Sequence, residues 1–224
     1  MLRSLANIGI MNTIKFKILV FLSIVMPLCV SANASQALLE NFFAEVSTLE
    51  ANFEQTVVDE TGMMLDFSSG RFSLSRPGKF RWDYESSDEA LDQGQQIIAD
   101  GKTIIMYDPD LEQVTQRSLG NAISQVPSLL LVQSGALLDQ HFSITDIGLT
   151  DGLSWVSLKP LAEDAAYQHL MIGFLKGQLN TIQLLDGLGN ETRLNLSSVL
   201  ENKSLPLDRF DFKVPEGADL LLAD

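Results

Sequence analysis

The feature that most constrains the fold is a series of short segments in which apolar and polar residues alternate, separated by turn signals. Phe80, Trp82 and Tyr84, for example, are interleaved with charged residues. A period of two residues is that of a strand with one buried face. The Asp100-Gly101 dipeptide between two apolar runs is a strong hairpin signal. The pattern therefore predicts a largely antiparallel β fold.

Counted along the chain, alternation and turns predict about eleven strands. They cover residues 53–57, 63–74, 80–84, 97–99, 104–107, 112–117, 142–147, 154–158, 169–174, 179–185 and 191–199, and a last alternating segment, 210–212, precedes Pro215. So many antiparallel strands pair as a sandwich or curl into a barrel.

Two regions depart from this period. Residues 36–48 place Leu39, Phe42, Phe43, Val46 and Leu49 at helical spacing, which predicts an amphipathic helix. Residues 119–138 predict one or two short helices, the second beginning near Pro127. An amphipathic helix must bury its apolar face, and the concave side of a curled sheet is one place for it.

The N-terminus has the pattern of a secretory signal peptide. Residues 1–34 contain three basic and no acidic residues, and an apolar run from Ile18 to Val30 ends in Ala32-Asn33-Ala34. The run is shorter than the roughly 20 residues of a membrane-spanning helix. We expect cleavage after Ala34, leaving one domain of residues 35–224 in the periplasm. Met11 is an alternative start of the signal peptide.

The single cysteine, Cys29, lies inside the predicted signal peptide. The residues before it, Met26-Pro27-Leu28, are not the small residues that a lipidated cysteine requires. We therefore expect a mature chain without cysteine and without a lipid anchor, which at this length can bury a core without disulfides.

Charge limits the partners. Removing residues 1–34 lowers the lysines and arginines from 15 to 12 against 29 acidic residues, a net charge of −17. Such a chain is repelled by nucleic acid and by anionic headgroups. We expect no nucleic-acid partner, no stable membrane insertion and a monomer, although acidity also serves simple solubility.

Catalytic patterns are weak. His141 and His169 have no carboxylate or serine at a recognisable motif spacing, and no nucleophile-elbow, zinc-protease or phosphate-loop motif occurs. Asp108, Asp110 and Glu112 alternate, but they lack the glycine and the terminal glutamate of a calcium loop. A hairpin turn is the favoured interpretation. We expect no enzymatic activity, no cofactor and no bound metal.

Large apolar residues occur on both the predicted helix and the strands. Methionine among them suits irregular ligand surfaces as well as core gaps. Both a filled core and a ligand cavity are consistent with this set, which comprises Phe42, Phe43, Phe53, Met63, Met64, Phe80, Trp82, Ile104, Met106 and Leu129 to Leu131.

An ordered set of motifs resembles the LolA family of outer-membrane lipoprotein carriers. Each block is weak alone, but the set covers the whole predicted mature chain in order. The blocks are Phe53-x-Gln55, Arg76-Pro77-Gly78-Lys79-Phe80-Arg81-Trp82, Asp100-Gly101-Lys102, Tyr107 to Thr115, and Phe210-x-Phe212-x-x-Pro215-x-Gly217.

The resemblance implies an unclosed antiparallel β-barrel of about eleven strands, with a helical lid over an apolar cavity that accepts the acyl chains of lipoproteins. It also implies two further partners, an inner-membrane lipoprotein-releasing ABC transporter and an outer-membrane lipoprotein receptor. Arg76 is the residue that would hold the lid closed by hydrogen bonds to backbone carbonyls. The expected cavity or lid residues are Phe43, Val46, Phe53, Phe80, Trp82, Pro127, Leu129, Leu130 and Leu131.

One departure from the family concerns the lid. Family members often carry an aromatic residue just after the lid proline, where this chain has Ser128. The alternative function is a binding module of the same fold that senses lipids or misfolded exported proteins. Such a module usually carries a second domain or an anchor, and the anchored receptor carries a lipidated cysteine.

Overall fold

The computed structural model of the chain describes residues 34–86, 94–119, 131–132, 135, 138–163, 165–206 and 208–223. The predicted signal peptide up to Asn33 lies outside the described residues. So do Pro127, Ser128, Leu129 and Leu130 of the predicted lid.

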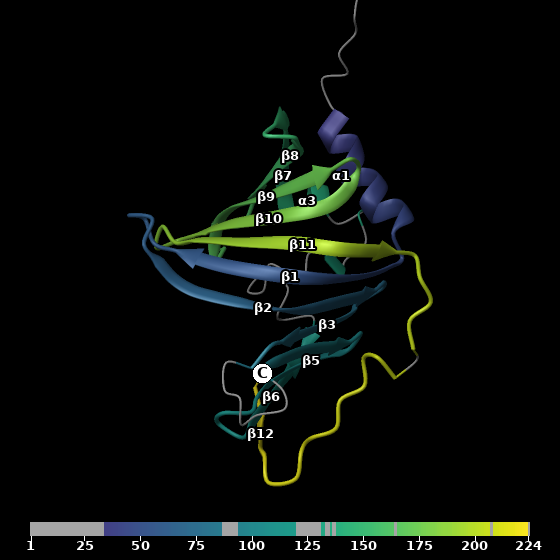
Figure 1. Cartoon of the computed structure of the whole chain (residues 1–224), viewed down its shortest axis with the longest axis vertical. Coiled ribbons are helices and arrows are strands. Elements are labelled where there is room, and N and C mark those ends of the chain that lie inside the picture. Colours follow the sequence, from purple (N-terminus) through teal and green to yellow (C-terminus); the bar gives the residue numbers. More distant parts are fainter. Residues whose placement is uncertain are drawn as a thin grey trace, which may run out of the picture. The chain divides into compact units, whose positions relative to one another are not determined.

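Twelve strands form one sheet, in the order β12-β6-β5-β4-β3-β2-β1-β11-β10-β9-β8-β7 (Figure 1). β7 and β12 are the two edges, so the barrel is unclosed, as the resemblance to the LolA family implied. The strands are β1 Thr48–Val58, β2 Met64–Ser75, β3 Lys79–Tyr84, β4 Gln96–Asp100, β5 Thr103–Asp108, β6 Gln113–Ser118, β7 Phe142–Thr150, β8 Leu153–Pro160, β9 Tyr167–Leu175, β10 Gln178–Asp186, β11 Glu191–Glu201 and β12 Asp219–Leu222.

Eleven of these strands match the predicted ones and pair antiparallel, and the twelfth corrects the prediction. β12 pairs parallel with β6, with Leu220 opposite Val114. The alternating segment at 210–212 is not a strand in the structure. Four residues without alternation carry no periodic signal, and a parallel partner this far away in the chain leaves no local trace.

Two helices are described, α1 Ala34–Glu45 and the short α3 Leu138–His141. α1 buries Leu39, Phe42 and Phe43 on one face, as predicted from their spacing, and contacts β7, β8 and β9. It ends at Glu45, before the predicted limit of residue 48, because Thr48 already pairs with Ser75 in the sheet. Neither described helix is long and apolar enough to cross a membrane.

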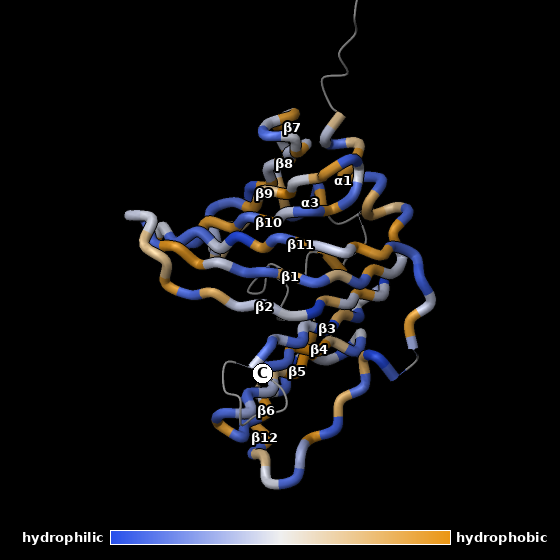
Figure 2. Tube along the Cα trace, in the orientation of Figure 1, coloured by the Kyte–Doolittle hydropathy of each residue, from blue (hydrophilic) through white to orange (hydrophobic). Residues whose placement is uncertain are grey.

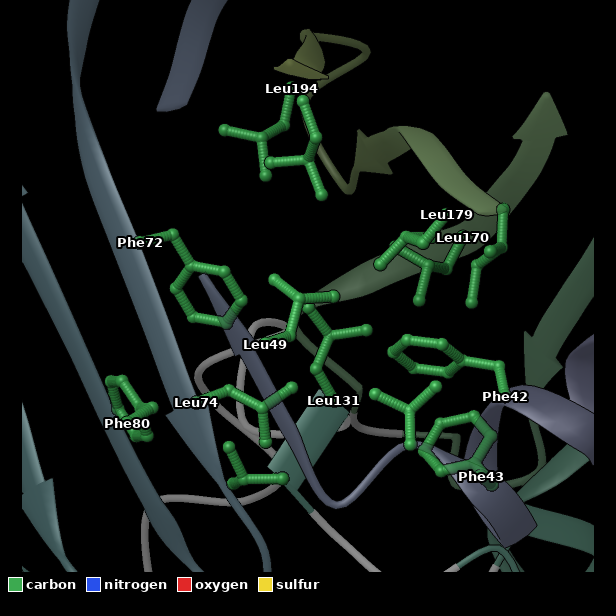
Figure 3. Packing of buried hydrophobic residues seen from close by; sticks show 14 of the residues in the cluster. Phe42, Phe43, Leu49, Phe72, Leu74, Phe80, Leu131, Leu170, Leu179 and Leu194 are labelled. Carbon is green, nitrogen blue, oxygen red and sulfur yellow. The ribbon is translucent and has the colours of Figure 1, made fainter. Parts of the chain in front are cut away.

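The hydrophobic core lies between the sheet and α1. Figure 2 shows polar and apolar residues alternating along the strands, and the buried apolar residues of the strands form one cluster with those of α1. In Figure 3 Phe42 and Phe43 of α1 lie opposite Leu49, Leu74 and other strand residues. One face of the sheet is therefore available for an apolar interior.

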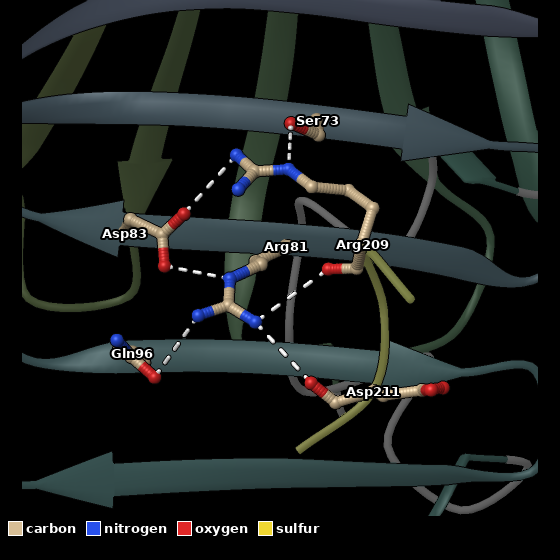
Figure 4. A network of polar contacts seen from close by, with 6 residues as sticks. All are labelled: Ser73, Arg81, Asp83, Gln96, Arg209 and Asp211. Carbon is tan, nitrogen blue, oxygen red and sulfur yellow. Dashed lines mark hydrogen bonds and ion pairs between the residues drawn. The ribbon is translucent and has the colours of Figure 1, made fainter. Parts of the chain in front are cut away.

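The other face of β2 and β3 is polar and is covered by the segment that joins β11 to β12 (Figure 4). Arg209 from that segment lies 3.1 Å from Asp83 and donates to Ser73 Oγ at 2.9 Å. Arg81 pairs with Asp83 at 2.7 Å and donates to the carbonyl of Asp211 at 3.3 Å. These contacts place the segment on the outer face, opposite the core.

Candidate functional site

Arg76, directly after β2, connects two separate segments that cover the core. Its Nη1 donates to the carbonyl of Phe42 at 3.0 Å and to the carbonyl of Val46, both at the C-terminal end of α1. Its Nε donates to the carbonyl of Leu131 at 3.1 Å. A planar guanidinium can satisfy several carbonyls at once. We call this set of hydrogen bonds the Arg76 latch.

The Arg76 side chain is also packed between two aromatic rings and partly buried. The guanidinium carbon lies 4.6 Å from the ring centroid of Phe42 and 4.8 Å from that of Phe43, within cation–π range. Burial lowers the pKa of Arg76 to about 10, so the group stays charged at neutral pH in a place that disfavours charge. Its Nη2 is buried and has no hydrogen-bond partner in the described part of the chain. The latch is therefore a polar contact in which the described residues leave one guanidinium nitrogen unpaired.

The opposite end of α1 is held by a carboxylate. Asp146 of β7 accepts hydrogen bonds from the backbone N–H groups of Ser35 at 2.9 Å and Gln36 at 3.2 Å. A negative charge at a helix N-terminus and a positive charge at its C-terminus both complement the helix dipole. Asp146 and Arg76 thus hold the two ends of α1 on the sheet.

We predict that α1 loosens at acid pH. Desolvation raises the pKa of Asp146, but hydrogen bonds from Gln36, Ser35 and Gly148 lower it more, and the pKa lies below its usual value. A carboxyl group whose pKa is lower in the folded than in the unfolded state stabilises the fold at pH values above the unfolded-state pKa. This contribution is lost as the pH falls through the folded-state pKa. Asp146→Asn should cost about 0.5–1 kcal/mol near neutral pH, measured as a lower thermal midpoint.

The pH dependence of stability supplies the control for Asp146→Asn. At pH values below the lowered pKa of Asp146, wild type and Asp146→Asn should converge in stability, because the wild-type carboxyl is then protonated. Asp151→Asn, which changes an exposed carboxyl in the turn after β7, should leave the pH profile unchanged. An Asp146→Asn protein that keeps the wild-type difference between neutral and acid pH would exclude this role for Asp146.

An apolar cavity of about 280 Å³ lies on the core side of the sheet. It is bounded by side chains from both halves of the sheet and by Leu131, whose carbonyl is held by the Arg76 latch. Opening the latch would therefore move part of the cavity wall. The lining residues are Gln55, Trp82, Tyr84, Ile97, Leu131, Leu170, Ile182, Leu184, Thr192 and Leu194.

A polar pocket of about 310 Å³ shares Gln55 and Tyr84 with the apolar cavity. Four carboxyl-bearing residues, Asp66, Glu85, Asp108 and Asp110, are among its walls. Burial and the charge of Asp66 raise the pKa of Tyr84 to about 12, so its phenol is neutral. The two spaces together offer apolar walls on one side of Gln55 and Tyr84 and polar walls on the other.

The predicted cavity and lid residues occupy three kinds of place. Trp82 and Leu131 line the apolar cavity. Phe43 lines a smaller hollow of about 240 Å³ beside α1 and α3. Phe53, Phe80 and Val46 are buried in the hydrophobic core. The structure thus brings Trp82, Leu131 and the Arg76 latch to one region, next to the packed core.

Sequence reasoning missed Asp146 and also Asn202. Asn202 Oδ1 accepts from the backbone N–H of Ser47 at 2.8 Å, and its Nδ2 donates to the carbonyl of Glu45 at 3.0 Å. Both residues act on main-chain groups more than 100 positions away. A side chain that meets distant backbone leaves no spacing pattern in the sequence.

The acidic alternation at Asp108, Asp110 and Glu112 belongs to a turn, as the sequence predicted. Asp108 Oδ1 accepts from the backbone of Asp110 at 3.1 Å between β5 and β6. Among the described residues, no group of three or more histidine, cysteine or acidic side chains is arranged to hold a metal ion.

An open sheet curved around a core, with a helix fastened over it and an apolar cavity in its wall, defines the class of unclosed β-barrels with a covered interior. The family described as outer membrane lipoprotein carrier protein LolA matches residues 44–213. The chain belongs to the LolA family.

Individual relatives agree with this assignment. The chain is 35% identical over 200 residues to the outer-membrane lipoprotein carrier protein of Methylobacillus flagellatus, covering 89% of this chain and 94% of that protein. It is 39% identical over 174 residues to the protein of that name from Azotobacter vinelandii, covering 78% and 81%. Among solved structures, an uncharacterized conserved protein of Thermus thermophilus has a similar fold, with a TM-score of 0.54, 11% identity and coverage of 84% and 99%.

Proposed function

We propose that the protein is a periplasmic carrier that binds the acyl chains of lipoproteins in its apolar cavity and covers them with α1 and Leu131. The observation that carries the proposal is the apolar cavity whose wall residue Leu131 is held by the Arg76 latch. Membership of the LolA family and the names of the relatives support the lipoprotein cargo.

Physical chemistry supports the need for such a carrier. Each acyl methylene removed from water contributes about 0.8 kcal/mol, so chains of roughly 16 carbons do not cross an aqueous space unaided. The cavity of about 280 Å³ is at the small end of the range for ligand pockets. Several whole chains need more room, so loading requires the latch to open.

Transfer in one direction requires partners on both sides. A ligand moves on only when the receiver offers it a lower free energy than the donor. We propose that an inner-membrane ABC transporter loads the carrier and that an outer-membrane receptor lipoprotein unloads it. A closed empty state that must be opened lowers the net affinity for the ligand and so favours release.

The signal-peptide pattern of the N-terminus supports the same function. We propose that residues 1–34 are a signal peptide removed after Ala34. The backbone nitrogen of Ser35 lies 2.9 Å from Asp146 Oδ2, so cleavage would turn this N–H donor into a charged amino group facing a carboxylate. The intact mass of the protein recovered from the periplasm should correspond to a chain that begins at Ser35.

A displacement experiment tests the carrier function. The purified mature protein should take up an apolar fluorescent probe, and a lipoprotein with intact acyl chains should displace it. The same lipoprotein after deacylation is the matched control and should leave the probe bound. Displacement by both forms would show that the protein part, not the acyl chains, occupies the site, and the proposal would fail.

A further inference from the structure

One residue in the wall of the apolar cavity, Trp82, has a buried hydrogen-bond donor for which the described residues supply no acceptor. Trp82 lines the cavity and is 3% exposed, and its indole Nε1 is buried with no partner in the described part of the chain. An indole N–H can only donate, and buried tryptophans usually find an acceptor. A buried donor left unpaired is destabilising. A ligand group that accepts from this N–H would remove the cost of leaving it unpaired among the described residues.

Packing holds the indole in place. Its ring is stacked on Phe72 at 4.2 Å between centroids, and Phe53 meets it edge to face at 4.8 Å. Both phenylalanines are themselves buried in the core. An aromatic face is at most a weak acceptor for an N–H group. The described residues therefore offer the indole no strong acceptor, and the two rings restrict its rotation.

The surroundings of Trp82 indicate which acceptor fits. Most of the cavity wall is leucine and isoleucine, which suits hydrocarbon. Tyr84 is two residues further along the same face of β3, about 7 Å away, and borders the polar pocket. A group bound at Trp82 thus lies between the apolar walls and the polar ones. In an acylated ligand, the ester or amide carbonyl is the group between hydrocarbon and polar head.

We propose that, once the Arg76 latch opens and the acyl chains widen the cavity, the buried Trp82 Nε1 donates a hydrogen bond to an ester or amide carbonyl oxygen of the bound chains, and that the cavity thereby distinguishes acyl chains from alkyl chains of equal length. The inference rests on the proposed acyl-chain function and adds the polar contact that selects the linkage. Hydrocarbon burial supplies most of the affinity, and the indole supplies the preference for a carbonyl.

The test compares two synthetic ligands on two proteins. One ligand is a short peptide whose N-terminal cysteine carries two ester-linked chains, and the other is its dialkyl ether analogue. Displacement of an apolar probe gives both affinities. In wild type the ester-to-ether affinity ratio should be about tenfold higher than in Trp82→Phe. Comparing the ratios cancels the difference in hydration between the ligands.

Trp155→Phe is the matched control, because it removes the indole N–H of the only other tryptophan and leaves Trp82 in place. It should keep the wild-type ratio. In that variant the single remaining indole N–H resonance should move downfield with the ester ligand and not with the ether. This second measurement decides the question if Trp82→Phe fails to fold.

The outcomes separate the two proposals. Equal ester-to-ether ratios in wild type and Trp82→Phe, or an indole resonance that responds alike to both ligands, would overturn the role of Trp82. In that case displacement by both ligands still supports the acyl-chain cavity. If neither ligand displaces the probe from wild type, the proposed function itself is wrong.

Discussion

Arg76→Leu is expected to tighten the binding of an acyl ligand by roughly tenfold to a hundredfold and to slow its release. The closed empty state is stabilised by the Arg76 latch, and a ligand must first open it. A hydrogen bond from a charged group contributes about 1.5–3 kcal/mol. Removing the latch removes this opening cost, and apparent affinity rises as the binding-competent fraction rises.

The measurement is the dissociation constant of an acyl probe and its rate of release to acceptor vesicles. Arg76→Lys keeps the charge but lacks the planar fork, so it should fall between wild type and Arg76→Leu. Arg71→Leu changes an exposed arginine of β2, the strand that precedes Arg76, and should match wild type. Wild-type release by a folded Arg76→Leu protein would remove Arg76 from the mechanism.

Arg76→Leu should also lower the stability of the protein, since the carbonyls of Phe42, Val46 and Leu131 lose their donor. Part of the arginine is exposed and its burial already disfavours the charge. We therefore expect a loss in the free energy of unfolding at the lower end of the range for charged hydrogen bonds, about 1.5 kcal/mol. Ligand affinity and stability thus change in opposite directions.

The strands and the helix of this molecule could be predicted because the spacing of apolar residues within each element indicates its type. The alternation of Phe80, Trp82 and Tyr84 correctly indicates one buried face of β3, because a strand's side-chain period is a property of neighbouring residues. The spacing of Leu39 and Phe42 likewise indicates α1. Each signal lies within one element, so the type of element follows from a few residues.

What the pattern did not reveal depends on groups brought together from distant parts of the chain. Arg76 was expected at the lid only from the resemblance to a family, because its acceptors are backbone carbonyls and these have no side-chain signature. Asp146 lies 110 positions from Gln36, and it accepts a hydrogen bond from the backbone N–H of that residue. β12 pairs with β6 across a similar separation. The unpaired indole N–H of Trp82 is a property of packing alone.

Leu184→Trp is expected to weaken binding of an apolar probe by more than about tenfold while leaving the fold intact. Leu184 lines the apolar cavity between Leu170 of β9 and Thr192 of β11, its neighbours across the strands. An indole there would occupy space that a ligand needs. Overpacking a filled core costs about 1–3 kcal/mol, but here the added ring enters an existing cavity and buries apolar surface, at about 25 cal/mol per Å².

The thermal midpoint of Leu184→Trp should therefore equal or exceed that of wild type, which separates loss of the binding space from loss of the fold. Ser197→Trp adds the same ring at an exposed position of β11 and should keep wild-type probe affinity. Full probe affinity in a stable Leu184→Trp protein would place the ligand outside this cavity. Loss of binding together with a raised midpoint would indicate that the ligand occupies this cavity and that its empty volume lowers the stability of the protein.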